Sequence, residues 1–325
     1  MKKFFLLVLV TATLGACAPK AFQMTSEGEN FDALTQISDS EKPCLYPFGG
    51  DLGENLVYVS REDDGSYNLY MKEKVLTKAV IQKTSGKNIN LAPNYCNANN
   101  RIVFQYFDKT NFDIYYIDAG KGKAITQVTN TDDDEYNPSW SPDGNIIVFE
   151  KGATPKTYAV ASQKSSKVYD GVAVKKNQIW LKDLKSKELK MIGEGSFPKI
   201  SPDGKNITFV KYDLDKSKSK ETGTLWIMSL EGDSPRQITD VNLGYATNPN
   251  WSPDGKNLIF QLTKKNKTDA DIYVIDVNGE NLRQYTVNKS NDFAPYWSVD
   301  DYIYFSSDRG AKASKYQIWR FKMKK

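Results

Sequence analysis

The sequence predicts an all-β protein: a six-bladed β-propeller whose ring is closed by an N-terminal strand that completes the last blade. Three observations lead to this fold class. One short unit occurs six times, the copies are spaced by the length of four short strands, and the last copy lacks a fourth strand that a matching pattern near the start can supply. Repeats of about 40 to 50 residues are typical of propeller blades, each a four-stranded sheet.

Each unit begins with a hairpin anchored on a proline. The clearest copies are NPSWSPDGNIIVF (137–149) and NPNWSPDGKNLIF (248–260). Pro and Gly in Ser-Pro-Asp-Gly favour a type I turn, and the apolar run after it favours a strand. The six anchor prolines are Pro47, Pro93, Pro138, Pro198, Pro249 and Pro295, which stand 45 to 60 residues apart. They therefore mark the first two strands of six blades.

The third strand carries an aromatic residue in the same slot of every unit. These residues are Tyr70, Tyr115, Trp180, Trp226, Tyr273 and Trp319. A fourth strand follows as AITQVT (124–129), ELKMIG (188–193), RQITD (236–240) or LRQYT (282–286). All six tryptophans fall in first-strand or third-strand slots, and we predict that they pack between blades as core, not as a glycan-stacking or base-stacking cluster.

The last unit ends at its third strand, with QIWRFKMKK. Near the start, LTQISDSEKP (34–43) mirrors ITQVTNTDDDEYNP (125–138). We therefore expect residues 34–38 to supply the outer strand of the last blade, which removes the open edge of a row of sheets. A single propeller domain is expected over residues 31–325.

The N-terminus, MKKFFLLVLVTATLGAC, has two lysines and then an apolar stretch. This pattern predicts a signal peptide over residues 1–16. Leu14 to Cys17 resembles the bacterial lipobox, which implies lipidation of Cys17, with residues 17–30 as lipid anchor and flexible tether. Ala18 in place of Asp implies, by resemblance to enterobacterial lipoproteins, the outer membrane, and we expect its periplasmic side. An ordinary secretory signal with a chance cysteine is the alternative.

Charge and composition exclude several classes of protein. The net charge is +4, and removal of Lys2 and Lys3 with the signal peptide leaves 42 basic against 40 acidic residues, or +2. This balance argues against nucleic-acid binding. The sequence has no histidine, which rules out histidine-based triads, general bases and metal ligands. Cys44 and Cys96 could pair in an oxidising compartment, and unpaired buried thiols are the alternative.

The WSPDG hairpin, followed by an apolar strand and Asp-Ile-Tyr, resembles the repeat of TolB-type (WD-repeat-like) six-bladed β-propellers, over residues 31–325. The resemblance implies a propeller of the cell envelope. Two features depart from the family. TolB proper has an α/β domain before its propeller, which is not expected here, and it is soluble, whereas this chain is expected to be lipidated. A role in the Tol–Pal system is therefore an analogy.

Candidate binding residues stand where one blade connects to the next. Glu135, Asp292 and Asn90 occupy the same slot, three residues before an anchor, and Asp134 ends the acidic run before Glu135. They are interpreted as contacts for a basic partner segment, as ligands of a hard cation or as a solvated loop. No loop has calcium-motif spacing, so no metal or other cofactor is expected.

Two loops are unusually long, at 152–176 and 213–223. Long loops on a rigid scaffold often carry recognition, and Tyr158 and Tyr169 in the first loop are candidate contacts. The second, rich in lysine and serine, is expected to be a solvated loop.

No Gly-x-Ser-x-Gly elbow is present, and no spacing singles out a carboxylate pair. We therefore expect a non-catalytic scaffold or adaptor that binds a cell-envelope protein and is held at the membrane by its N-terminal lipid. A glycan-binding or nutrient-binding lipoprotein is the second hypothesis, and an enzyme that acts on polysaccharide is the third.

Overall fold

The computed structural model describes residues 31–32, 34–50, 54–120, 122, 124–152, 177–215, 220–265, 267–310 and 316–323. The described residues form strands, turns and irregular segments, with no helix among them. Accordingly, this part of the chain contains no helix long and apolar enough to cross a membrane. The expected signal peptide (1–16) and the expected anchor and tether (17–30) with Cys17 lie outside the described residues.

Twenty-four strands are described, and they recur in groups of four. The first strands are β2 (Cys44–Gly49), β6 (Ile89–Cys96), β10 (Asp134–Trp140), β14 (Ser196–Ile200), β18 (Gly244–Trp251) and β22 (Asp292–Trp297). The second strands are β3 (Leu56–Arg61), β7 (Arg101–Phe107), β11 (Ile146–Gly152), β15 (Asn206–Asp215), β19 (Asn257–Lys264) and β23 (Tyr302–Ser307). The third strands are β4 (Tyr67–Lys72), β8 (Phe112–Asp118), β12 (Gln178–Asp183), β16 (Lys220–Ser229), β20 (Asp271–Asp276) and β24 (Gln317–Lys322). The outer strands are β5 (Ile81–Gln82), β9 (Ile125–Gln127), β13 (Leu189–Glu194), β17 (Arg236–Gln237), β21 (Arg283–Gln284) and, from the N-terminus, β1 (Thr35–Gln36).

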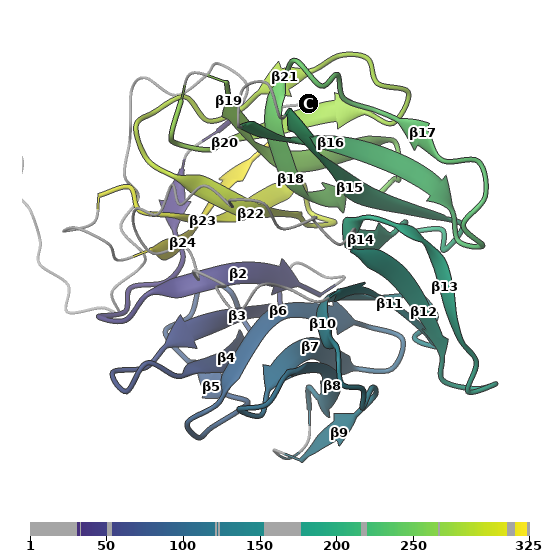
Figure 1. Cartoon of the computed structure of the whole chain (residues 1–325). Helices are drawn as coiled ribbons and strands as arrows, with labels where there is room; N and C mark the ends of the chain where they lie inside the picture. Colours follow the sequence, from purple (N-terminus) through teal and green to yellow (C-terminus); the bar gives the residue numbers. More distant parts are fainter. Residues whose placement is uncertain are drawn as a thin grey trace, which may run out of the picture.

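Neighbouring strands within each group pair antiparallel, and the groups are arranged about a common centre. Single parallel pairs, Tyr67 with Ile89 and Gly223 with Tyr245, link two groups into each of two eight-stranded sheets. Figure 1 shows the first strands near the middle and the outer strands at the periphery. Strands β2, β6, β10, β14, β18 and β22 contact one another in that order, and β22 contacts β2. The arrangement is an all-β propeller.

Strand β1 pairs with β24, so the two ends of the described chain lie side by side. Gln36 lies opposite Trp319, as Gln127 lies opposite Tyr115 and Gln284 opposite Tyr273 in other groups. β1 therefore pairs with β24 in the same way as an outer strand pairs with the third strand in these other groups. The shared pattern of LTQIS and ITQVT reflects this common position.

A hydroxyl group after the outer strand fixes the third strand in five of the six groups. It accepts a hydrogen bond from a backbone N–H of the third strand, at 2.8 to 2.9 Å in each case. The acceptor residues are Thr84, Thr129, Thr239, Thr286 and, in the N-terminal segment, Ser38. The third group has Gly193 in this region, opposite Ile179, and its register shifts there.

Every first strand has a β-bulge at its anchor proline. The residue before each anchor has a φ of 49° to 53°, in the left-handed region that non-glycine residues rarely adopt. These residues are Tyr46, Ala92, Asn137, Phe197, Asn248 and Ala294. In four groups a side-chain oxygen of the preceding second strand accepts the N–H of this residue, as when Ser306 Oγ accepts from Tyr46 at 3.0 Å. The bulges thus fix how one group joins the next.

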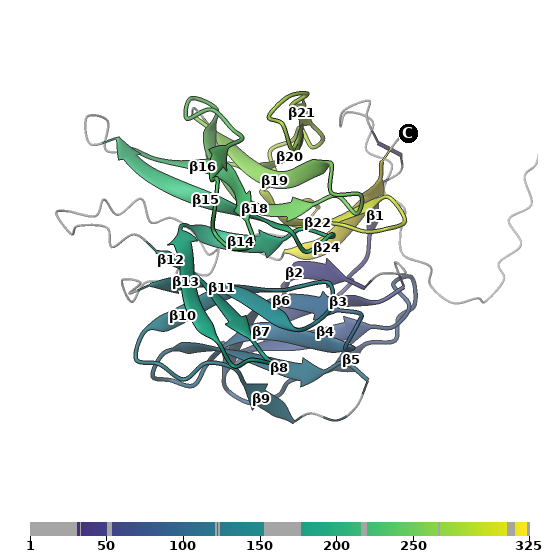
Figure 2. The ribbon, with the colours of Figure 1, turned by 90° about the vertical axis from the view of Figure 1, so that its right-hand side faces the viewer.

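Two sequence expectations need correction. The loop expected over 213–223 is shorter, because β15 continues to Asp215 and β16 begins at Lys220, and the two strands form a long projecting hairpin (Figure 2). At its base, Gly223 lets β18 approach closely, since a Cβ there would meet the carbonyl oxygen of Ala246 at 2.4 Å.

The tryptophans are not uniformly core. Trp140, Trp251 and Trp319 are buried, whereas Trp180, Trp226 and Trp297 keep part of their surface exposed. The cysteines agree with one of the two alternatives: Cys44 and Cys96 are both buried, and neither forms a disulfide bond within the described part of the chain. Burial raises the pKa of the Cys44 thiol to about 11, so this thiol is poorly reactive.

Candidate functional site

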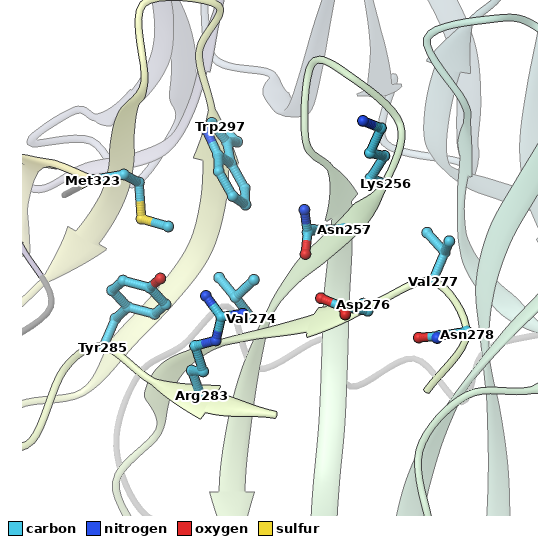
Figure 3. Close-up of a pocket in the computed structure, with 10 residues that line it drawn as sticks. All are labelled: Lys256, Asn257, Val274, Asp276, Val277, Asn278, Arg283, Tyr285, Trp297 and Met323. Carbon is cyan, nitrogen blue, oxygen red and sulfur yellow. The ribbon is translucent and has the colours of Figure 1, made fainter. Parts of the chain in front are cut away.

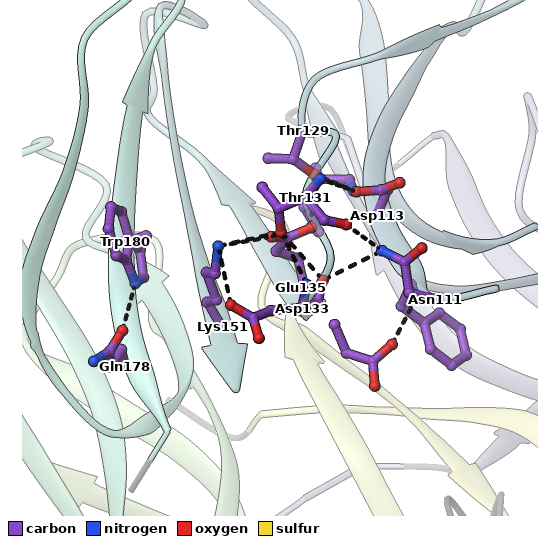
Figure 4. Close-up of polar contacts among 12 residues, drawn as sticks. Asn111, Asp113, Thr129, Thr131, Asp133, Glu135, Lys151, Gln178 and Trp180 are labelled. Atoms are coloured by element: carbon purple, nitrogen blue, oxygen red, sulfur yellow. Dashed lines mark hydrogen bonds and ion pairs between the residues drawn. The ribbon is translucent and has the colours of Figure 1, made fainter. Parts of the chain in front are cut away.

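The acidic slot expected to contact a partner lies at the start of the first strands. Glu135, the second residue of β10, is fully buried. Thr129 donates a hydrogen bond to its Oε2 at 3.1 Å, and Thr131 donates one to its Oε1. Lys151 Nζ lies 3.6 Å from Glu135 Oε1 and 3.4 Å from Asp133 Oδ2 (Figure 4). The carboxyl group thus lies inside a network of the protein's own side chains.

A second carboxyl group reaches this network from the neighbouring group of strands. Asp113, the second residue of β8, is buried, and the Thr129 hydroxyl, which also donates to Glu135, lies 3.4 Å from Asp113 Oδ1. Burial and the nearby Asp113 carboxyl group raise the pKa of Glu135 to about 7, while the hydroxyl groups of Thr131 and Thr129 favour the ionised form and oppose the shift. Glu135 therefore titrates near neutral pH.

The equivalent residues elsewhere are also engaged within the protein. Asp292 is fully buried and forms an ion pair with the buried guanidinium of Arg309. The side-chain amide of Asn90 donates to the carbonyl oxygen of Tyr67 at 2.8 Å. Asp134 accepts a hydrogen bond from the backbone N–H of Phe112 at 2.8 Å, which fixes the start of β8.

Glu135, Asp292 and Asn90 are therefore buried below the protein surface. Asp134, in β10, connects this strand to β8 by its hydrogen bond. A partner contact at these four residues stays a prediction. Tyr158 and Tyr169, the other two candidates, lie outside the described residues. Within the described ranges, no group of three or more Asp, Glu, Cys or His side chains is arranged to hold a metal ion.

A pocket of about 220 Å³ lies at the opposite end of the first strands, among the Ser-Pro-Asp-Gly turns. All six first strands contribute to its lining. The residues that follow the anchor prolines are Phe48, Asn94, Ser139, Lys199, Asn250 and Tyr296, and all six line it. Exposed residues such as Pro142, Pro202 and Val299 lie among the lining residues, so the pocket opens to solvent.

Lys199 is the charged residue of this central pocket. Its ammonium group donates to the carbonyl oxygen of Pro138 at 3.3 Å, and no Asp or Glu is among the described lining residues. Burial without a compensating carboxylate lowers the pKa of Lys199 to about 8. The side chain keeps a positive charge at neutral pH, at a cost in desolvation.

A second cavity, of about 420 Å³, lies between the fifth and sixth groups of strands. Its lining includes Asp276, Arg283 and Tyr285 on one side and Trp297 and Met323 on the other (Figure 3). We call this cavity the lateral groove. Aromatic faces beside charged and amide groups suit a polar ligand with an apolar face.

Sequence reasoning did not identify either cavity. The available signal was the position directly after each anchor proline, which holds a lysine in FPKI and uncharged residues in the other five units. This position lies outside the pattern of prolines and aromatic residues that defines the repeat. The acidic slot stands out in the sequence by its charge, and in the structure its side chains have partners within the protein.

The recurrent four-stranded sheets about a central pocket define a β-propeller. The chain belongs to the family of the TolB beta propeller domain, whose family model matches residues 21–172 and 196–325. This membership confirms the resemblance seen in the WSPDG hairpins.

Individual relatives include the Tol-Pal system protein TolB of Francisella tularensis subsp. holarctica (strain OSU18). It is 25% identical over 252 residues, which are 73% of this chain and 52% of that protein. Dipeptidyl-peptidase 5 of Porphyromonas gingivalis is 26% identical over 162 residues, or 49% of this chain and 22% of that protein. The chain thus spans about half the length of the Tol-Pal relative.

Solved structures show the same fold. TolB from Acinetobacter baumannii superposes with a TM-score of 0.58 at 16% identity, over 84% of this chain and 64% of that chain. An oligogalacturonate lyase in complex with manganese superposes with a TM-score of 0.58 at 14% identity, over 94% of this chain and 96% of that one. Since TolB and a lyase share this fold, function must be argued from the sites.

Proposed function

We propose that this chain is a non-catalytic, lipid-anchored propeller of the cell envelope that binds a partner protein and acts as a scaffold or adaptor at the outer membrane. Cys17 is the proposed lipidation site, and the periplasmic side is the proposed location. The principal support is the central pocket. It is open, lined by all six first strands, and its described lining has no pair of carboxylates of the kind that glycoside hydrolysis uses. Such a pocket suits binding more than the hydrolysis of a polysaccharide.

Two further facts support a role in the envelope. The family is that of the TolB propeller, and a relative covering 73% of this chain is named as a Tol-Pal system protein. The N-terminal pattern of basic residues, apolar stretch and Leu-Gly-Ala-Cys supports secretion and lipidation. Together they favour a protein held at a membrane surface by acyl chains while its propeller meets other proteins.

The proposed architecture is a closed ring of six blades in which β1 completes the last one. The cyclic contacts of the six first strands and the pairing of β1 with β24 support it. Deletion of residues 31–39 removes β1 and the buried side chains of Leu34 and Ile37. At about 1.5 to 3 kcal/mol for each buried side chain, the truncated protein should lose at least about 3 kcal/mol. An unchanged melting temperature would contradict closure by this segment.

In-cell cross-linking of the tagged, full-length protein tests the binding function. One dominant envelope protein in the cross-linked fraction, absent from that of Cys17→Ser, is the expected result. Lipidation of Cys17 is checked in the same cells by mass spectrometry of the N-terminal peptide. A lipidated protein without a partner above background would overturn the scaffold function.

Glycan or nutrient binding is the second candidate, and the lateral groove favours it. Trp297 and Tyr285 offer aromatic faces there, next to the charged groups of Arg283 and Asp276. A thermal-shift screen with neutral and acidic oligosaccharides should then show stabilisation that Arg283→Ala removes, since Arg283 lines the lateral groove and not the central pocket. A panel without any stabilising sugar would eliminate this candidate. A polysaccharide-acting enzyme, the third, would need turnover that depends on Glu135 or Asp292.

A further inference from the structure

The central pocket has two unlike walls. Asn94, Ser139, Lys199 and Asn250 come from four consecutive first strands and form a polar wall. Phe48 and Tyr296 come from β2 and β22, which contact each other, and their ring centroids lie 4.5 Å apart. In the cycle of first strands, β14 with Lys199 stands three steps from β2 with Phe48. The cation therefore lies across the pocket from the aromatic pair.

The acceptor atoms of the two asparagines are already in use. Asn94 Oδ1 accepts the backbone N–H of Trp140 at 2.9 Å, and Asn250 Oδ1 accepts that of Trp251 at 3.1 Å. Because a backbone N–H can bond only to the amide oxygen, these contacts fix the orientation of both amides. The NH₂ groups of Asn94 and Asn250 have no acceptor among the described residues, although Asn94 is only 4% exposed.

Ser139 and Lys199 add to this surplus of donors. Ser139 Oγ accepts the backbone N–H of Ile200 at 3.2 Å, which leaves the hydroxyl proton for another acceptor. Lys199 has three N–H donors, and Pro138 O is the acceptor for one of them. The polar wall thus offers one positive charge and several unused donors, with its acceptors largely occupied. Such a wall complements an anion.

We propose that the central pocket binds a carboxylate: Lys199, Asn94, Ser139 and Asn250 hold the anionic group, and Phe48 with Tyr296 packs against an adjoining apolar or ring portion of the ligand. Carboxylate oxygens accept several hydrogen bonds, which matches the number of donors. A volume of about 220 Å³ suits a single small group, not an extended ligand. The inference goes beyond the proposed scaffold function and does not depend on the identity of any partner.

The first experiment compares an acid with its neutral isostere. The full chain is titrated with phenylacetate and with phenylacetamide, and tryptophan fluorescence is followed because Trp140, Trp251 and Trp297 line the pocket. We expect saturable binding of the acid, about tenfold or more tighter than that of the amide. Equal affinity for the two compounds would overturn the proposal.

Substitutions locate the site. Lys199→Met should weaken phenylacetate binding about tenfold or more, and Lys199→Arg should retain most of it. The matched control is Lys205→Met, which removes the same charge from an exposed position in the adjacent turn and should leave affinity unchanged. Equal losses in Lys199→Met and Lys205→Met would refute a specific role for Lys199.

Asn250→Asp keeps the oxygen that accepts from Trp251 and replaces the NH₂ donor with a negative oxygen. It should abolish phenylacetate binding while circular dichroism and melting temperature stay near those of the parent. This variant keeps the test informative if Lys199→Met does not fold. Unchanged affinity in a folded Asn250→Asp variant would also overturn the proposal.

Two further probes distinguish between two natural sources of a carboxylate ligand. N-acetylphenylalanine represents the end of a polypeptide, and glucuronate represents a sugar acid. The tighter of the two identifies the source, provided that its binding requires Lys199. If none of phenylacetate, N-acetylphenylalanine and glucuronate showed binding that depends on Lys199, the proposed carboxylate site would be refuted. The proposed scaffold function would not be affected, because the cross-linking experiment tests it independently.

Discussion

The two ends of the first strands differ in whether their charged side chains have partners of opposite charge. At the starting end, the buried carboxyl groups of Glu135 and Asp292 have partners within the protein, Lys151 and Arg309 among them. In the unit that contains β14, Lys199 comes four residues after the position that corresponds to that slot. Lys199 lines an open pocket without a described carboxylate beside it. We call these the closed end and the open end.

The difference indicates that charged residues at the two ends of the first strands serve different purposes. At the closed end, Asp292 and Arg309 form a buried ion pair, so removal of one partner should damage stability. At the open end, an uncompensated cation reduces stability, so its removal should increase stability and impair binding. The following predictions test this contrast, from the largest expected effect to the smallest.

Arg309→Met should have the largest effect on stability. It leaves the Asp292 carboxylate buried without its guanidinium partner, and such a loss costs about 3 to 5 kcal/mol. Urea unfolding at neutral pH measures the change. Restoring neutrality with Asp292→Asn in the same chain should recover part of the loss.

Lys190→Met is the control for Arg309. Lys190 forms an ion pair with Glu231 at 2.5 Å, and the two side chains are 34% and 64% exposed. Water already solvates this charge, so its loss should cost less than about 1 kcal/mol. Equal costs for the two variants would mean that burial does not set the strength of the closed end.

Glu135→Gln should change how stability depends on pH. The native pKa of about 7 exceeds the ordinary value of 4.5, so the folded protein holds a proton between these values that the unfolded chain has released. The parent therefore loses stability as pH rises from about 4.5 to 7, by at most about 3 kcal/mol. Glu135→Gln, which mimics the protonated acid, should lack this loss.

Urea unfolding at pH 5 and pH 7.5 measures the effect of Glu135→Gln. The exposed Glu188 provides the control, because Glu188→Gln should follow the parent at both pH values. If the Glu135→Gln variant showed the same pH dependence as the parent, the raised pKa of Glu135 would not be the cause of that dependence.

The fold followed from the sequence because its main determinants recur. A proline, a turn and an aromatic residue return in each unit, and LTQIS (34–38) repeats an outer-strand pattern that pairs with β24. The sites did not follow in the same way. Asp113 and Lys151 are 22 and 16 residues away from Glu135; strand pairing brings Lys151 to Glu135, and packing of β8 against β10 brings Asp113 near it. Sequence spacing alone cannot show that a charged residue is buried and compensated.

Lys199→Met should stabilise the folded protein while it removes the proposed carboxylate binding. The native pKa of about 8 lies below the ordinary value of 10.5, because burial disfavours the charged form. Below pH 8 the buried side chain is charged, and the full cost of burying that charge is subtracted from the stability of the folded protein. The gain at pH 7 should be about 1 to 3 kcal/mol. As pH rises from 8 to 10.5 the parent sheds this charge, and its stability should approach that of the variant. Lys205→Met should show neither effect, and a destabilised Lys199→Met would contradict the contrast between the ends.

The smallest effects concern the hydroxyl groups that bond to the third strands. Thr239 Oγ1 accepts the backbone N–H of Leu225 at 2.9 Å and has no described carboxylate among its hydrogen-bond partners. Thr239→Val should cost about 1 kcal/mol in urea unfolding, because it leaves one buried N–H without an acceptor. Thr129→Val should cost more, since Thr129 also donates to Glu135 at 3.1 Å. Equal costs would show that Glu135 does not depend on this hydroxyl, and the closed end would then rest on Lys151 and Thr131.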